Sequence, residues 1–198
     1  MASSSQAPNG LRHLKRYVTT HDAEGKAVLS KVLEPAVPAQ EVLNGGITFQ
    51  LVYTNKQHPS FTESKDVEGY QRYLKDPPAL VIPGGTVCRF CDFAPGHLSP
   101  MHRTQSLDFG VVVEGEMELV LDSGAVQHLY QGDTVVQRGT NHAWRNVTPS
   151  KEVDGKCIPQ WARMMFVLQA ADPVTLQSGE RLAEDEGGID SRVSRGHR

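Results

Sequence analysis

The sequence lacks the features that mark membrane-spanning, secreted and disulfide-stabilised proteins. No stretch approaches the roughly 18 consecutive apolar residues that a membrane-spanning helix requires. The opening segment MASSSQAPNGLRHL has no apolar core of the kind found in secretory signals. Cysteine occurs three times, at Cys88, Cys91 and Cys157, and an odd count in a chain of 198 residues does not indicate a disulfide framework. We therefore expect a protein of the reducing cytoplasm.

An excess of positive charge is also missing. The 20 Lys and Arg residues are outnumbered by 23 Asp and Glu residues, which gives a net charge of −3 and a pI of about 6.2. Proteins that bind nucleic acids or anionic membranes present a basic surface, so we expect neither kind of partner. Hydrophobic residues make up 38% of the chain, which is enough for one globular domain with a sizeable core.

Short apolar runs separated by turn residues predict an all-β protein. The runs are rich in Val, Phe and Tyr, and no long amphipathic helical pattern interrupts them. A hairpin is expected over residues 17–29, with Gly25 in its turn. The other expected strands cover residues 47–54, 86–93, 109–113, 116–121, 126–130, 134–137, 142–146 and 162–169. Strands this short and closely spaced are typical of a sandwich or barrel.

Three regions are expected along the chain. Residues 1–85 form an N-terminal arm with strands that extend a sheet, and residues 86–170 form a barrel. Residues 171–198 form a charged, Gly-rich tail whose last ten residues are expected to be disordered. Residues 55–83 are polar and punctuated by proline, which predicts a long loop with at most one helical turn, at 67–74. A loop of this length is a candidate flap over a binding site.

Two segments join polar side chains to strand ends. They read Gly96-x5-His102-Arg103-Thr104-x3-Asp108-x6-Gly115 and Gly132-x4-Gln137-Arg138-Gly139-x2-His142-x3-Asn146. Because side chains alternate along a strand, His102 and Thr104 share one face, and His142, Trp144 and Asn146 share another. If both segments line one small barrel, two imidazoles and the Asp108 carboxylate converge in an otherwise apolar pocket.

These segments resemble the two signature motifs of the cupin superfamily, G-x5-H-x-H-x3,4-E-x6-G and G-x5-P-x-G-x2-H-x3-N. The resemblance implies a double-stranded β-helix, or jelly-roll barrel, in which three histidines and a glutamate bind one divalent metal. His102 and His142 match metal ligands, Asp108 stands at the glutamate position, and Thr104 replaces the second histidine. The implied metal set is therefore His102, Asp108 and His142, which suits iron, manganese or zinc. No organic cofactor is implied.

The sequence around the motifs is similar to that of small one-domain cupins from fungi and bacteria. Some of these are encoded beside polyketide or aromatic-compound enzymes, which implies an enzyme of secondary metabolism with a polyketide-like or aromatic oxygenated substrate. The leading hypothesis is a lyase or isomerase that dehydrates or decarboxylates its substrate by proton transfer in a dry pocket, with or without a metal. The alternatives are a non-haem iron dioxygenase that uses His102, Asp108 and His142 and a non-catalytic barrel that binds a small molecule.

The expected site combines catalytic and substrate-binding residues. For catalysis these are His102, His142, Asp108 and Thr104. For substrate binding they are Arg89 (as a carboxylate anchor), His97, Trp144, Asn146, Met164 and Phe166. Core packing is the alternative role for the aromatic residues and Met164, and an ion pair or an outward position is the alternative for Arg89.

A homodimer is expected as well. The strands predicted in the first 54 residues leave sheet edges that must be paired or covered. Cupins commonly dimerise by sheet extension, so the resemblance implies the same arrangement here. Light scattering is expected to give about twice the chain's mass of 21.8 kDa, and a monomer at micromolar concentration would contradict the expectation.

Overall fold

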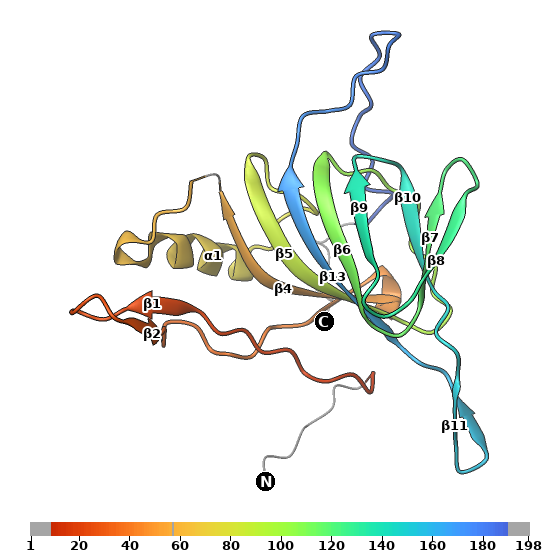
Figure 1. Ribbon diagram of the computed structural model, residues 1–198, viewed down its shortest axis with the longest axis horizontal. Coiled ribbons are helices and arrows are strands. Elements are labelled where there is room, and N and C mark those ends of the chain that lie inside the picture. The colour runs from red at the N-terminus through yellow and green to blue at the C-terminus, as the bar shows by residue number, and fades with distance from the viewer. Residues whose placement is uncertain (1–8, 57, 190–198) are drawn as a thin grey trace.

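The protein forms two antiparallel sheets that enclose one core. The computed structural model describes residues 9–56 and 58–189, and within them the larger sheet has six strands in the order β3-β4-β5-β13-β6-β9 (Figure 1). These strands are Gln40–Val42, Ile47–Lys56, Gly85–Phe93, Ala162–Ala170, Ser106–Glu114 and Thr134–Arg138, in that order. The smaller sheet has the order β10-β7-β8, formed by His142–Asn146, Met117–Leu121 and Val126–Leu129.

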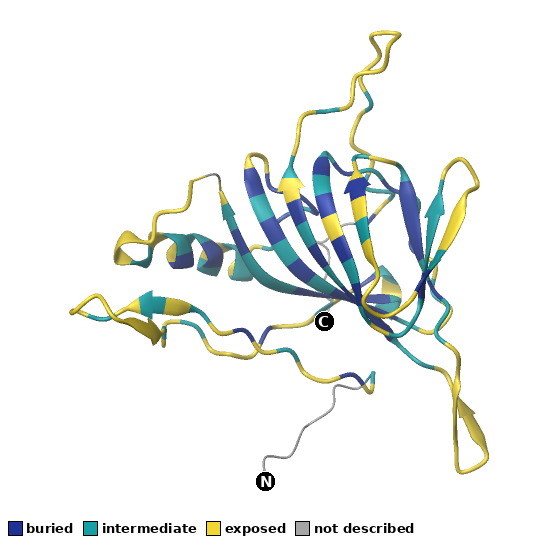
Figure 2. Cartoon of the chain, viewed as in Figure 1, coloured by how far each residue is buried: buried dark blue, intermediate teal, exposed yellow. Residues whose placement is uncertain are grey.

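Alternation of side chains along the strands creates the core. In β6 and β13 buried residues alternate with exposed or half-buried ones over most of the length, as Figure 2 shows. The buried side chains of both sheets meet in one cluster, which includes Phe93, Met117, Trp144 and Met164. The rings of Trp144 and Phe166, one from each sheet, lie with their centroids 5.5 Å apart. The all-β barrel predicted from the sequence is therefore confirmed.

The predicted strands are confirmed to within a few residues at their ends, and the predicted hairpin contains β1 (Thr19–His21) and β2 (Ala27–Leu29). A further hairpin, β11 (Lys151–Val153) and β12 (Lys156–Ile158), lies outside the two main sheets. Single 3₁₀ turns occupy Leu43–Gly45 and Thr62–Ser64.

The prediction of one helical turn within residues 55–83 is wrong. Helix α1 spans Lys65–Lys75 and lies beside β4 (Figure 1). Its buried residues are Val67 and Tyr70, and the Tyr70 hydroxyl donates a hydrogen bond of 2.7 Å to the Leu51 carbonyl. Contacts with the sheet therefore stabilise the helix, whose apolar residues Val67, Tyr70 and Leu74 follow the helical period. No helix among the described residues is long and apolar enough to cross a membrane.

The regions before and after the barrel motifs take part in the same structure. Strand β4 pairs with β5 along almost its whole length, so a boundary at residue 85 divides one continuous sheet. After β13 the chain returns to the barrel, where Asp185 exchanges two backbone hydrogen bonds with Arg103 and Ile189 is buried in the core. The expected disorder of the last ten residues concerns positions that, apart from Ile189, lie outside the described residues.

Candidate active site

A small cavity, which we call the inner cavity, lies between the two sheets. Its volume is about 50 Å³, which is room for a few water molecules. The polar side chains that line this inner cavity are Arg89, Ser99, His102, Thr104, Asp108 and His142. The apolar lining includes Ile47, Phe49, Leu80, Phe93, Trp144, Phe166, Leu168 and Ile189. The predicted convergence of two imidazoles and a carboxylate in an apolar pocket is thus present.

His102 and His142 are held together by the backbone. The N–H of each residue donates to the carbonyl of the other, at 2.8 and 2.9 Å, and the ring centroids lie 4.2 Å apart. Nδ1 of His102 lies 3.0 Å from the Pro100 carbonyl, and Nδ1 of His142 lies 2.9 Å from the Thr140 carbonyl. A carbonyl can only accept, so we assign the ring proton to Nδ1, and each Nε2 keeps a free lone pair.

Both imidazoles are kept neutral by their surroundings. Burial lowers the pKa of His142 to about 3, and the neighbouring His102 adds to this shift. Burial also lowers the pKa of His102. At neutral pH the pair therefore presents two neutral rings, each with an Nε2 that accepts a hydrogen bond.

The buried His142 makes stability depend on pH. Its pKa of about 3 lies below the ordinary value of 6.5. Between these two pH values the unfolded chain therefore binds a proton at His142, whereas the folded protein does not. This contribution to stability is fully present above pH 6.5 and is lost as the pH falls toward 3. Between pH 7 and 5 we expect wild type to lose about 2 kcal/mol more than His142→Gln in urea unfolding. Equal losses would contradict the assignment, and exposed His21→Gln is the control that should behave as wild type.

Asp108 carries a buried carboxyl with few partners. Its Oδ2 accepts a long hydrogen bond of 3.4 Å from Thr104 Oγ1, which itself accepts from Ser106 Oγ at 2.9 Å. Oδ1 is buried and has no hydrogen-bond partner among residues 9–56 and 58–189. Burial raises the pKa of Asp108 to about 6, and the nearby hydroxyls of Ser106 and Thr104 and the charge of Arg89 oppose the shift. A carboxyl with this pKa exchanges protons readily near neutral pH.

Three predicted substrate-binding residues do not line the inner cavity. The His97 ring lies against Gly46, so closely that a Cβ atom at position 46 would collide with the ring. Met164 is fully buried in the core. Asn146 serves the backbone, because its Nδ2 donates to the carbonyls of Phe93, Ala94 and Gln160 at 3.0–3.1 Å and its Oδ1 accepts from the Thr148 N–H. Alternation along β10 suggested that Asn146 faces the site, but its amide instead binds the backbone at the end of β5 and in the segments that follow β5 and precede β13.

Asn146→Ala is expected to lower stability by about 2 kcal/mol, because it leaves buried carbonyls without donors. Chemical denaturation measures this loss, and Asn55→Ala, at a half-buried position where the amide makes one local hydrogen bond of 2.6 Å, is the control. Activity per folded molecule is expected to stay near wild type. If Asn146→Ala folds but loses turnover, Asn146 has a role in substrate binding and not only in stability.

The metal set inferred from the motif is not gathered as one cluster. Two imidazoles with Nδ1 held by carbonyls are the usual arrangement of metal-binding histidines. However, no group of three His, Cys, Asp or Glu side chains among the described residues is placed to hold a metal ion. Asp108 is instead turned toward Thr104. The residues present therefore do not fit a centre with three protein ligands, and we derive no step through a metal.

Much of the apolar lining comes from segments that carry no motif. Phe49 and Ile47 come from β4, Leu80 from the stretch after α1, and Ile189 from the tail. Alternation within residues 47–54 predicted a strand there, but nothing in the sequence indicates which sheet face it supplies. Leu80 and Ile189 have no periodic pattern that could have identified them.

The chain is similar in sequence to known proteins. Residues 89–154 match the Cupin_2 family, described as Cupin domain. Phomopsin biosynthesis cluster protein D of Diaporthe leptostromiformis is 42% identical over 167 residues, covering 84% of this chain and 83% of that protein. Oryzines biosynthesis cluster protein J of Aspergillus oryzae is 39% identical, with coverages of 88% and 92%. The cupin-domain-containing oxidoreductase virC of Hypocrea virens is also 39% identical, with coverages of 88% and 84%.

Proposed function

Since the chain belongs to the cupin superfamily, as its two motifs predicted, we propose that it is an enzyme that moves protons on a small oxygenated substrate. The reaction is a dehydration, decarboxylation or isomerisation. The observation that supports this proposal best is the convergence of the buried side chains of His102, His142 and Asp108 in one mostly apolar cavity. Groups that exchange protons are most effective where water is excluded and their positions are fixed.

The arrangement suggests a division of roles. Asp108 is the acid–base residue, because its carboxyl is buried, sparsely hydrogen-bonded and near its pKa at neutral pH. The Nε2 atoms of His102 and His142 accept hydrogen bonds from a substrate hydroxyl or enol. Neither ring has a free N–H that could stabilise negative charge, because each Nδ1–H already donates to a backbone carbonyl. Negative charge on the substrate faces Arg89 instead.

The relatives suggest where such a reaction takes place. Two of them are named as members of biosynthesis clusters, for phomopsin and for oryzines. We infer that the substrate is an intermediate of a comparable pathway, polyketide-like or aromatic and rich in oxygen.

An oxidation by molecular oxygen is the second candidate. The observation that favours it is that relatives such as virC are named cupin-domain-containing oxidoreductases. This candidate requires a redox-active metal, for which the described residues bring together two histidines and no third ligand.

One experiment separates these reactions. The gene is deleted in a producing strain, and the metabolite that accumulates is incubated with the purified protein in deuterium oxide, under nitrogen and under air. Turnover under nitrogen is expected, with solvent deuterium in the product if the reaction is a decarboxylation or an isomerisation. Strict dependence on oxygen, together with stoichiometric iron in the protein, would favour the oxidation. Binding of the metabolite without conversion under either gas would favour a non-catalytic barrel that binds a small molecule.

Histidine variants test the site itself. His102→Ala and His142→Ala are each expected to lower turnover by about 10²-fold. The control is His128→Ala, because the half-buried His128 ring contacts Glu116 at 2.8 Å and does not line the inner cavity. Turnover that survives the loss of both His102 and His142 would refute every enzymatic role assigned to the pair.

A further inference from the structure

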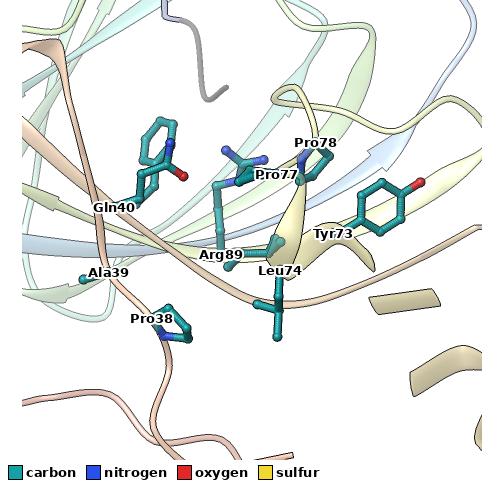
Figure 3. A pocket seen from close by; sticks show the side chains of 10 residues that line it. Pro38, Ala39, Gln40, Tyr73, Leu74, Pro77, Pro78 and Arg89 are labelled. Carbon is teal, nitrogen blue, oxygen red and sulfur yellow. The ribbon is translucent and has the colours of Figure 1, made fainter. Parts of the chain in front are cut away.

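A second cavity lies on the other side of the inner cavity's wall. Its volume is about 210 Å³, roughly four times that of the inner cavity. It lies between the sheet and the end of α1, and Figure 3 shows Tyr73, Leu74 and Pro77 along one side. Phe49 and Leu51 of β4 supply further apolar surface. We call this space the outer cavity.

Arg89 stands in the wall between the two cavities. It lines both of them, and so does Phe49. The guanidinium lies over the Phe49 ring at 5.0 Å from the centroid. In the sheet, Arg89 is paired with Leu51 on one side and with Phe166 on the other. A group bound at Arg89 is therefore at the boundary of the space that contains Asp108 and the histidines.

Among residues 9–56 and 58–189, no acidic side chain forms an ion pair with the buried charge of Arg89. The residue is 4% exposed, and its Nη2 donates to the carbonyls of Ala79 and Leu80 at 3.0 and 3.1 Å. Its Nε has no hydrogen-bond partner, and no carboxylate of the described residues forms an ion pair with it. Asp108 and Glu186 act on Arg89 only as more distant charges.

Another buried arginine shows how this chain satisfies such a charge. Arg163 is 3% exposed and binds both oxygens of Asp92, at 2.5 and 2.7 Å. A buried guanidinium without such a partner is costly, and its planar donors match a carboxylate. The missing partner of Arg89 is thus expected to be an anion that enters from outside.

We infer that the outer cavity binds an organic acid, with the carboxylate on Arg89 and the apolar body against Phe49, Leu51 and Leu74. This inference rests on the proposed function and narrows its substrate class to carboxylic acids. The inner cavity admits a few waters at most, so the bulk of the molecule lies in the outer cavity. The carboxylate, bound to Arg89, then lies at the boundary of the inner cavity, which Asp108 and the two histidines line.

Binding of 3-phenylpropanoate tests the inference, with its neutral amide as the matched probe. Calorimetry on wild type is expected to show saturable binding of the acid and at least about tenfold weaker binding of the amide, because a buried guanidinium prefers an ionised partner. The ¹⁵Nε resonance of Arg89 is expected to shift during titration with the acid. Equal affinity for acid and amide, or no binding of the acid, would overturn the inference.

Two variants locate the site. Arg89→Gln is expected to lower affinity for the acid at least about tenfold and to remove the preference over the amide. Leu74→Trp fills the outer cavity and leaves Arg89 in place, so it is expected to abolish binding and decides the question if Arg89→Gln does not fold. Unchanged binding in Leu74→Trp would overturn the placement in the outer cavity. The control is Arg16→Gln, because Arg16 is buried against Tyr70 and lines neither cavity.

The same measurements separate this inference from the proposed function. His142→Ala is expected to bind the acid with an affinity close to that of wild type while losing turnover. If the acid binds as described but the accumulated metabolite is never converted, the binding site stands and the catalytic proposal fails. If a neutral metabolite is converted and the acid does not bind, the reverse holds.

Discussion

Replacing Asp108 with asparagine is expected to lower turnover by about 10³-fold and, above pH 7, to raise stability. Burial raises the pKa of Asp108 from 3.8 to about 6. The favourable contribution of its protonated form is fully present below pH 3.8 and is lost as the pH rises through 6. At pH 8 the ionised carboxylate thus costs at most about 3 kcal/mol, at about 1.4 kcal/mol per pK unit. Asparagine does not ionise and avoids this cost.

Opposite changes in activity and stability would distinguish a catalytic carboxyl from a structural one. Turnover of the accumulated metabolite and urea unfolding at pH 8 and pH 5 measure the two effects, and the stability gain is expected to shrink at pH 5. Asp172→Asn, at an exposed position, is the control and is expected to change neither. An Asp108→Asn protein that turns over normally would remove Asp108 from the mechanism.

Arg163→Met is expected to destabilise the protein by about 3 to 5 kcal/mol. The substitution leaves the carboxylate of Asp92 buried without its charged partner. Asp92 would retain donors from Gln50 and Asn9, at 2.8 and 3.1 Å, but no compensating charge from Arg163. Arg163 Nη1 also donates to the Arg12 carbonyl at 2.8 Å, so the N-terminal segment loses an attachment to the sheet.

Urea denaturation at pH 7 measures the loss, and a surface ion pair supplies the control. Arg145 contacts Glu118 at 2.8 Å with its side chain 42% exposed, so Arg145→Met is expected to cost less than about 1 kcal/mol. The double variant Asp92→Leu/Arg163→Met is expected to recover much of the loss, because it removes both charges. Equal losses in Arg163→Met and Arg145→Met would show that burial of the pair contributes nothing.

Local sequence patterns predicted the strands because the alternation of apolar and polar residues within a strand reflects which of its two faces is buried. Alternating apolar residues mark 162–169, and turn residues such as Gly124 separate β7 from β8. The spacing of the two motifs also predicted that His102 and His142 meet. That prediction worked because each histidine lies at a strand end or bridge whose position the turns determine.

Contacts between distant segments could not be predicted in the same way. Helix α1 depends on Tyr70 reaching β4, and the helix contains Gly69, which disfavours helix formation. The pair of Asp92 and Arg163 joins residues far apart in sequence, and neither neighbourhood indicates a partner. The outer cavity depends on the packing of α1, so a sequence that did not predict the helix could not predict the cavity.

The reciprocal peptide hydrogen bonds between His102 and His142 have a consequence for divergence within the family. Main-chain atoms alone make this bridge, so the distance between the two positions does not depend on which side chains occupy them. Either imidazole can therefore be exchanged for another polar side chain while the backbone bridge stays in place. A lineage that carries such a bridge can change its chemistry one residue at a time and inherit the same frame.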